Sequence, residues 1–204
     1  MNYCDAQLDR DIIAIECNNI SVKGAEREGL IFNRADLDLD EMATGGNEYV
    51  IQTLPLKTGK TPFKVVQPTR TPFNGTKTEA VVGTYATTYT HTLQIVVLNH
   101  GDCVAGLIDK LASGEFVVAM KNRSVNNDSG TSPAPVAHHY PWQLYGIEGG
   151  LHLASAVREL YNDDTLAGWL VTLTETDAQK SGLFATSDLI ESYLNPTPDP
   201  SAEG

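Results

Sequence analysis

The sequence predicts a mainly β protein of the α+β kind, an antiparallel β-sandwich or small barrel flanked by one short helix and carrying a long extended arm or loop. The first observation behind this prediction is residues 84–98, which are dense in threonine, tyrosine and β-branched side chains. Bulky residues alternate there with small or polar ones, which is the pattern of a long half-buried strand. Residues 115–120 form a second, shorter run that we also expect to be a strand.

The second observation is a helical pattern between those two strands, at residues 103–111. Asp102 is suited to cap its start, and Ser113 with Gly114 is suited to end it. A helix of about three turns cannot bury its own apolar stripe, so we expect it to lie against the sheet that contains both strands. Its apolar side chains share one face at helical spacing: Val104, Leu107, Ile108 and Leu111.

Further strands are expected on both sides of this unit. Residues 140–147 have β character, and the glycines at 146, 149 and 150 indicate a bend or bulge after them. Residues 151–161 fit either a strand or a helix over 154–160, and a hairpin with the clear strand at 168–175 is favoured. Earlier short strands are expected at residues 12–17, 29–33 and 49–54.

The chain is interpreted as one β-rich domain over residues 1–194, with a disordered tail at 195–204. A flexible loop is expected at about 122–139. The arm spans about 55–83, where four prolines exclude a regular helix or a central strand.

The arm is read as an extended segment or edge hairpin that leaves the body and orders against an acidic neighbour, with a mobile loop as the alternative. It gathers five of the fourteen basic residues and two phenylalanines that directly follow prolines. The candidate contacts to an adjoining subunit are Phe63, Phe73, Lys60, Lys64 and Arg70.

Composition excludes several functional classes. The formal net charge of −12 disfavours a conventional nucleic-acid-binding module. No run of about 18 apolar residues predicts a membrane span, and the N-terminus lacks the pattern of a secretory signal. Three cysteines, at positions 4, 17 and 103, are expected to be buried free thiols in a reducing cytoplasm.

No motif in the chain predicts catalysis, and we expect no enzyme activity, cofactor or metal. Gly59-Lys60-Thr61 lacks the first glycine of a phosphate-binding loop, because position 54 is Leu54. Asp36, Asp38 and Asp40 begin like a calcium loop, but Glu41 stands where glycine is needed, so a solvated acidic edge is expected. One His–Cys pair, His100 and Cys103, does not make a zinc site.

Four stretches together resemble the virion structural proteins of tailed bacteriophages, of the tail-tube kind found in phages and prophages of Bacteroidetes-type hosts. They are residues 17–19 with 29–37, the strand at 84–98, residues 116–122 after the helix, and residues 142–151 with the strand at 168–175. The resemblance implies a β-sandwich or small barrel that assembles into hexameric rings, stacked into a tube. It carries no catalytic residues.

The resemblance further implies a virion protein assembled in the host cytoplasm, with copies of itself and adjacent virion proteins as partners and no membrane. An acidic channel wall suits DNA that must slide past without specific binding. Two alternatives stay open: another virion role (ring adaptor, tail terminator or head decoration), or a β-sandwich carbohydrate-binding or adhesin module. The last needs exposed aromatic side chains, whereas Trp142 and Trp169 lie in strand patterns and are expected in the core.

Overall fold

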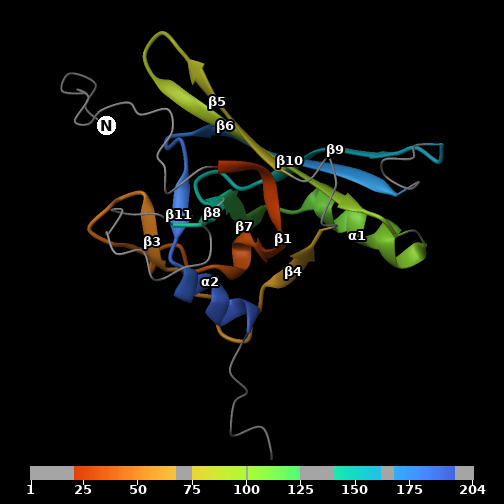
Figure 1. The fold of residues 1–204 in the computed structure, drawn as a ribbon, viewed down its shortest axis with the longest axis horizontal. Coiled ribbons are helices and arrows are strands. Elements are labelled where there is room, and N and C mark those ends of the chain that lie inside the picture. Colours follow the sequence, from red (N-terminus) through yellow and green to blue (C-terminus); the bar gives the residue numbers. More distant parts are fainter. Residues whose placement is uncertain (1–20, 68–74, 100, 125–139, 162–167, 196–204) are drawn as a thin grey trace, which may run out of the picture.

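A computed structural model describes residues 21–67, 75–99, 101–124, 140–161 and 168–195. The described residues form two β-sheets that face each other, together with two α-helices (Figure 1). The predicted mainly β sandwich with a short helix is therefore confirmed.

The larger sheet has seven strands, all antiparallel except for the β11–β3 pair. Its order is β2 (Ala43–Thr44), β3 (Val50–Thr53), β11 (Leu183–Ala185), β8 (Trp142–Tyr145), β7 (Phe116–Ser124), β1 (Ser21–Asn33) and β4 (Phe63–Val66). The smaller sheet has four antiparallel strands in the order β5 (Gly75–Val82), β6 (Thr87–Val97), β10 (Trp169–Ala178) and β9 (His152–Arg158).

Strand β6 is the long strand expected from the threonine-rich pattern. Its inward side chains His91, Leu93 and Ile95 are buried, and the residues between them are mostly half-exposed. The strand begins at Thr87, because residues 83–86 form the turn of a hairpin with β5, in which the Gly83 N–H donates to the Ala86 carbonyl at 2.9 Å. The expected hairpin of residues 151–161 with 168–175 is also present, as β9 and β10.

Strand β7 separates two hydrophobic clusters. Val117 and Ala119 pack into a cluster with α2 (Ser187–Leu194), whereas Phe116, Val118 and Met120 pack into a cluster between the sheets and α1 (Asp102–Ser113). All five side chains are buried, which explains why the run is continuously apolar rather than alternating.

Helix α1 connects the two sheets, and here one prediction is wrong. Its flanking strands, β6 and β7, lie in different sheets, so the helix closes one end of the sandwich and packs near β9. The N-cap is Gly101, with φ at 130° and no side-chain cap bond, so Asp102 is the first helical residue and not the cap. The predicted end is confirmed, since the helix stops at Ser113 and Gly114 follows as its C-cap.

Helix α2 was not anticipated from the sequence. The Thr186 hydroxyl caps its start by accepting a hydrogen bond from the Leu189 N–H at 3.4 Å. Ile190 and Leu194 are buried against the outer face of the large sheet, and the Tyr193 hydroxyl donates to the Leu54 carbonyl at 2.6 Å. Only eight residues carry this amphipathic pattern, which is too short to be distinctive in a sequence.

The structure confirms the expected glycine bend and tryptophan positions and contradicts the expected start of the first strand and the burial of Cys103. The glycine bend after β8 is confirmed, since Gly146 and Gly150 both have positive φ. Strand β1 starts at Ser21, eight positions before its expected start, and Cys103 is exposed rather than buried. Trp142 is buried and Trp169 is half-buried beside the inter-sheet cluster, as expected.

Several expected features fall on residues that the structure does not describe. They are the strand at 12–17, the thiols at positions 4 and 17, the tail beyond 195 and most of the loop at 122–139. The first residues of that loop, up to Ser124, continue β7.

Gln67 joins the two sheets where β5 no longer covers β6. Its Oε1 accepts from the Val96 N–H at 2.8 Å and its Nε2 donates to the Val96 carbonyl at 3.2 Å, so the amide pairs with β6 as a neighbouring strand would. The residue is 3% exposed, and it directly follows β4 of the large sheet. Two buried backbone groups therefore depend on one side chain.

Replacing Gln67 with methionine keeps the length of the side chain but removes both bonds. We expect the Gln67→Met variant to lose about 2 kcal/mol of unfolding free energy, because the Val96 N–H and C=O remain buried without partners. Urea denaturation measures the loss. Gln94→Met is the matched control, since Gln94 has no side-chain hydrogen bond to the described residues, and an equal loss in both variants would contradict this role for Gln67.

Candidate functional site

The buried polar side chains of the described residues join segments of the fold that lie far apart in the chain. No group of three or more His, Cys, Asp or Glu side chains lies close enough there to hold a metal ion. Glu175, 2% exposed, accepts from the Gly146 N–H at 2.8 Å and the Gly149 N–H at 2.7 Å, so its two oxygens fix the turn after β8. Both carboxylate oxygens of Glu175 therefore stabilise the fold through charge-assisted hydrogen bonds.

His91 and Tyr145 fasten the β5–β6 hairpin to the body in the same way. His91 Nε2 lies 3.1 Å from the Lys180 carbonyl, which can only accept, so Nε2 carries the proton and Nδ1 accepts from the Thr78 hydroxyl at 2.9 Å. Tyr145 on β8 donates its hydroxyl to Thr76 on β5 at 2.8 Å. Burial raises the pKa of Tyr145 to about 12.

The proline-rich arm at 55–83 is built into both sheets. Its two strands, β4 and β5, are the terminal strands of the large and the small sheet, respectively. The edge positions were expected, because proline cannot serve a central strand. The two strands lie in different sheets and do not pair with each other, so the segment is not the single edge hairpin that was expected. Pro62 directly precedes β4, and the link between the two strands is residues 68–74, which the structure does not describe.

The basic residues at the start of the arm bind the acidic segment of their own chain. Lys60 Nζ lies 3.0 Å from Asp36 Oδ1, and Lys57 Nζ donates to the Ala35 carbonyl at 2.8 Å. Hydrogen bonds from Asn33 and then Lys60 lower the pKa of Asp36. The predicted acidic neighbour of Lys60 therefore lies within the same chain.

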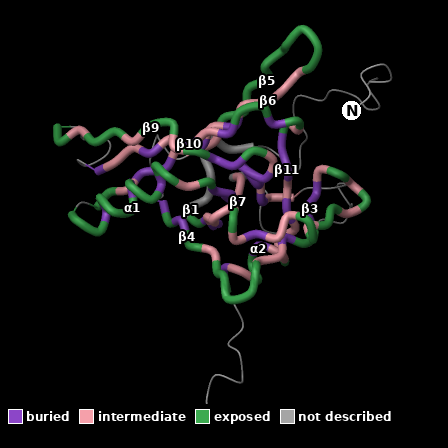
Figure 2. Tube along the Cα trace, turned by 180° about the vertical axis from the view of Figure 1, so that it is seen from behind, coloured by how far each residue is buried: buried purple, intermediate pink, exposed green. Residues whose placement is uncertain are grey.

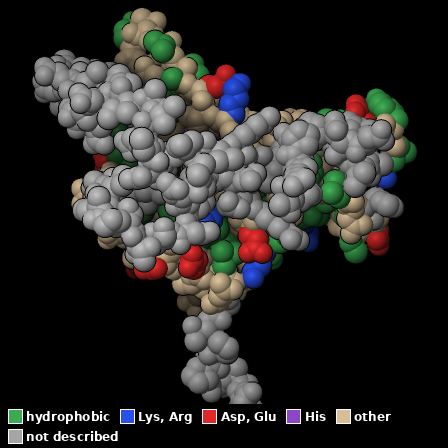
Figure 3. All heavy atoms as spheres, in the orientation of Figure 1, with side chains coloured by type: hydrophobic (Ala, Val, Ile, Leu, Met, Phe, Trp, Pro, Cys, Tyr) green, Lys and Arg blue, Asp and Glu red, His purple; other side chains and the backbone are tan. Residues whose placement is uncertain are grey.

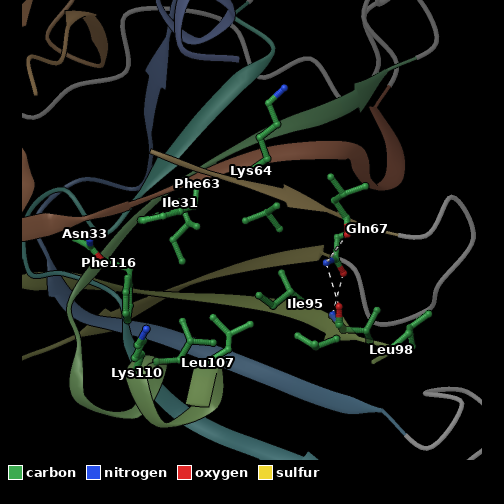
Figure 4. Close-up of a pocket in the computed structure, with 15 residues that line it drawn as sticks. Ile31, Asn33, Phe63, Lys64, Gln67, Ile95, Leu98, Leu107, Lys110 and Phe116 are labelled. Atoms are coloured by element: carbon green, nitrogen blue, oxygen red, sulfur yellow. Dashed lines mark hydrogen bonds between the residues drawn. The ribbon is translucent and has the colours of Figure 1, made fainter. Parts of the chain in front are cut away.

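The other candidate contact residues separate. Phe63, 58% exposed, and Lys64 lie on β4 at the edge of the large sheet, whereas Phe73 and Arg70 lie outside the described residues. Phe63 faces an apolar groove between β4, β6 and α1, while Lys64 points away from it in the close-up (Figure 4).

This apolar groove has a volume of about 600 Å³, within the range of sites that hold a small ligand or a few side chains. It lies beyond Gly75, the first residue of β5, where the Gln67 side chain bonds to Val96 of β6. Leu107, 44% exposed, and Lys110 project toward it from α1. Its apolar walls include Ile31, Phe63, Ile95, Val97, Leu107 and Phe116.

The opposite end of β6 carries an apolar projection. The hairpin tip consists of Val81, Val82 and Tyr85, which are 50%, 81% and 95% exposed. Figures 1 and 2 show the β5–β6 hairpin extending beyond the body, with its loop exposed. Hydrophobic side chains also gather at the far end of the molecule, over β9 and α1 (Figure 3), where Leu160 and Tyr161 are exposed.

The small sheet has two unpaired edges and one open face. Within the described residues no strand pairs with the outer edge of β5 or of β9. The face turned away from the large sheet is rich in hydroxyl groups, and its carboxylate Glu79 is joined to Lys77 at 2.8 Å. Besides Lys77 and Glu79, the polar residues that the register places on this face are Thr88, Thr90, Thr92, Gln94, His152, Ser155, Thr172 and Thr174.

Sequence reasoning found part of this arrangement. It selected Phe63 and Lys64, of which Phe63 faces the groove, but it missed the hairpin tip because Tyr85 was read as the beginning of a half-buried strand. The signal was Gly83 between two β-like runs, which is typical of a hairpin turn. The groove has no sequence signal, because its walls come from strands and a helix far apart in the chain.

Comparisons with known proteins add no relative: no protein-family model, curated protein or solved structure matches the chain. Among the described residues, neither α1 nor α2 has the length and hydrophobicity of a membrane-spanning helix.

The anchor at Tyr145 predicts an alkaline loss of stability. The pKa is about 12 in the folded protein against 10.0 unfolded, so the stabilisation is complete below pH 10 and is lost as the pH rises toward 12. Between about pH 9 and pH 11 we expect the unfolding free energy to fall by about 1.3 kcal/mol more in the wild type than in Tyr145→Phe. Urea denaturation at both pH values measures this, and Tyr85→Phe, at an exposed position, should behave as the wild type.

Proposed function

We propose that the protein is a self-assembling structural subunit of the phage tail-tube kind, which forms rings by joining its small sheets edge to edge. The observation that carries the proposal is a four-stranded sheet whose two outer strands have no further strand beside them in the described part of the chain. Exposed edges favour pairing with another chain, and closure into a ring removes them.

The strand directions support this joining. The four strands alternate in direction across the sheet, so β5 and β9 run in opposite directions. When β5 of one copy pairs with β9 of the next, the antiparallel pattern continues without a break. Six copies, the number that the resemblance implies, would give a barrel of about 24 strands and a backbone diameter of about 45 Å.

The open face of the small sheet would line this channel, because the large sheet covers the other face. Binding of a phosphate backbone requires free cations, and Lys77 on this face is already paired with Glu79. The net charge led us to expect an acidic channel wall; we propose instead that DNA passes a hydroxyl-rich wall without specific binding. The net charge of −12 then acts at the remaining surface, where it disfavours contact with nucleic acid.

The carbohydrate-binding alternative has less support. Such a module needs aromatic side chains that converge on one open surface. Trp142 is buried at 2% exposure, and the exposed rings of Tyr85 and Tyr161 lie at opposite ends of the small sheet.

Electron microscopy and native mass measurement of the purified protein test the proposal. We expect closed rings that share one copy number. We expect Val157→Lys, which places a charge on the exposed edge strand β9, to raise the concentration needed for ring formation at least tenfold. A protein that stays monomeric at every concentration would contradict the proposed function.

The matched control is Ser192→Lys, which adds the same charge at an exposed position of α2 on the other side of the molecule. It should assemble as the wild type does. Circular dichroism confirms that both variants remain folded, so a loss limited to Val157→Lys is attributable to the edge.

A further inference from the structure

We infer that the hairpin tip of one copy inserts into the apolar groove of the next, so that copies associate head to tail along β6. This inference extends the proposed function, because it assigns a contact between rings in addition to the edge pairing within a ring. Its occupant is a second copy of this chain, and its contact surface is formed by described residues.

The first step of the argument is that the described residues leave the side chains of the hairpin tip largely uncovered. Of the three side chains that form the tip (Val81, Val82 and Tyr85), Tyr85 and Val82 are the most exposed, at 95% and 81%. The root of the hairpin is fixed to the body, since Tyr145 donates a hydrogen bond to Thr76 and His91 Nε2 donates one to the Lys180 carbonyl. A positioned apolar projection of this kind is suited to docking, because little conformational freedom is lost on binding.

The second step is that the apolar groove offers a matching receptor. Phe63 and Leu107 remain 58% and 44% exposed on its two sides, although they lie beside a well-packed core. Lys110 faces the groove from α1 and has no salt-bridge partner among the described residues. A tyrosine fits such a groove. Its ring can cover apolar surface, its hydroxyl can accept a hydrogen bond from the Lys110 ammonium, and its π face can attract that cation.

The third step is geometric. The hairpin tip adjoins Thr87 at one end of β6, and the groove includes Ile95, Val97 and Leu98 at the other. The eleven residues of β6 separate them by about 35 Å, so one chain cannot bring its own tip into its own groove. Two different surfaces that fit each other make a heterologous contact, which repeats from copy to copy and produces stacks.

Photo-crosslinking tests the contact directly. Tyr85 is replaced by the photoreactive amino acid p-benzoylphenylalanine in the full chain, and crosslinked peptides are identified by mass spectrometry. We expect crosslinks between copies that fall on residues 63–67, 95–98 or 107–111. Adding Leu107→Asp to the same protein should reduce their yield at least tenfold.

The matched control carries the photoreactive residue at Tyr161, which is 84% exposed at the other end of the small sheet. Because this end of the small sheet also borders the groove, only crosslinks between copies are compared; those from Tyr161 should avoid the groove and should not respond to Leu107→Asp. Crosslinks from position 85 that fall elsewhere, or that persist unchanged with Leu107→Asp, would overturn the inference.

Microscopy of Val82→Asp/Tyr85→Ser separates this inference from the proposed function. Single rings that no longer stack support both, whereas stacks as in the wild type overturn the tip contact and leave the ring proposal standing. If the wild type forms no rings but position 85 still crosslinks to the groove, the contact stands and the ring proposal fails.

Discussion

The packing of β6 on β7 across the sandwich is the contact on which the rest of the structure depends. Leu93 and Ile95 of β6 share one buried cluster with Val118 and Met120 of β7, and removing such side chains from water supplies most of the stabilisation of a β-sandwich. Because β6 is longer than the core beneath it, its two ends reach beyond the region of close packing. One end projects as the hairpin tip, and the other borders the apolar groove.

Polar groups complete this arrangement where apolar packing stops. Gln67, His91 and Glu175 are the buried polar residues of the described chain, and each satisfies backbone or side-chain groups of another segment. A buried polar group without a partner costs about 1–3 kcal/mol, so each of these contacts fixes the relative position of the segments that it joins.

The sequence predicted the strands and the helix that have strong periodicity and missed those that do not. The alternation in residues 84–98 and the apolar stripe of α1 are local patterns, and both elements form where they were expected. Helix α2 is short, and strand β1 begins in a polar segment, so neither has a distinctive local pattern. The exposure of Cys103 was also not predicted. Cys103 lies in the first turn of α1, and which side of that turn faces solvent depends on the segments that the helix packs against.

For the candidate site, the sequence identified Phe63 through its setting in a proline-rich basic segment, which proline confines to the edges of sheets. It assigned Lys60 to a neighbouring subunit, although the nearest carboxylate, Asp36, belongs to the same chain. Spacing along the chain does not indicate which carboxylate lies near Lys60. The distance between Lys60 and Asp36 is set by the turn that brings residues 57–60 back toward the short helix at 34–36.

By itself, the sequence determined the fold class, the long strand, the helix beside it and the edge character of the proline-rich segment, because each follows from side-chain periodicity or from the missing N–H of proline. Only the tertiary structure decided that β6 and β7 belong to different sheets, that Gln67 joins those sheets, and that a groove opens at one end of β6 and an apolar tip at the other. These features arise from contacts between segments far apart in the chain, and the free energy of such contacts depends on three-dimensional packing that local patterns do not encode.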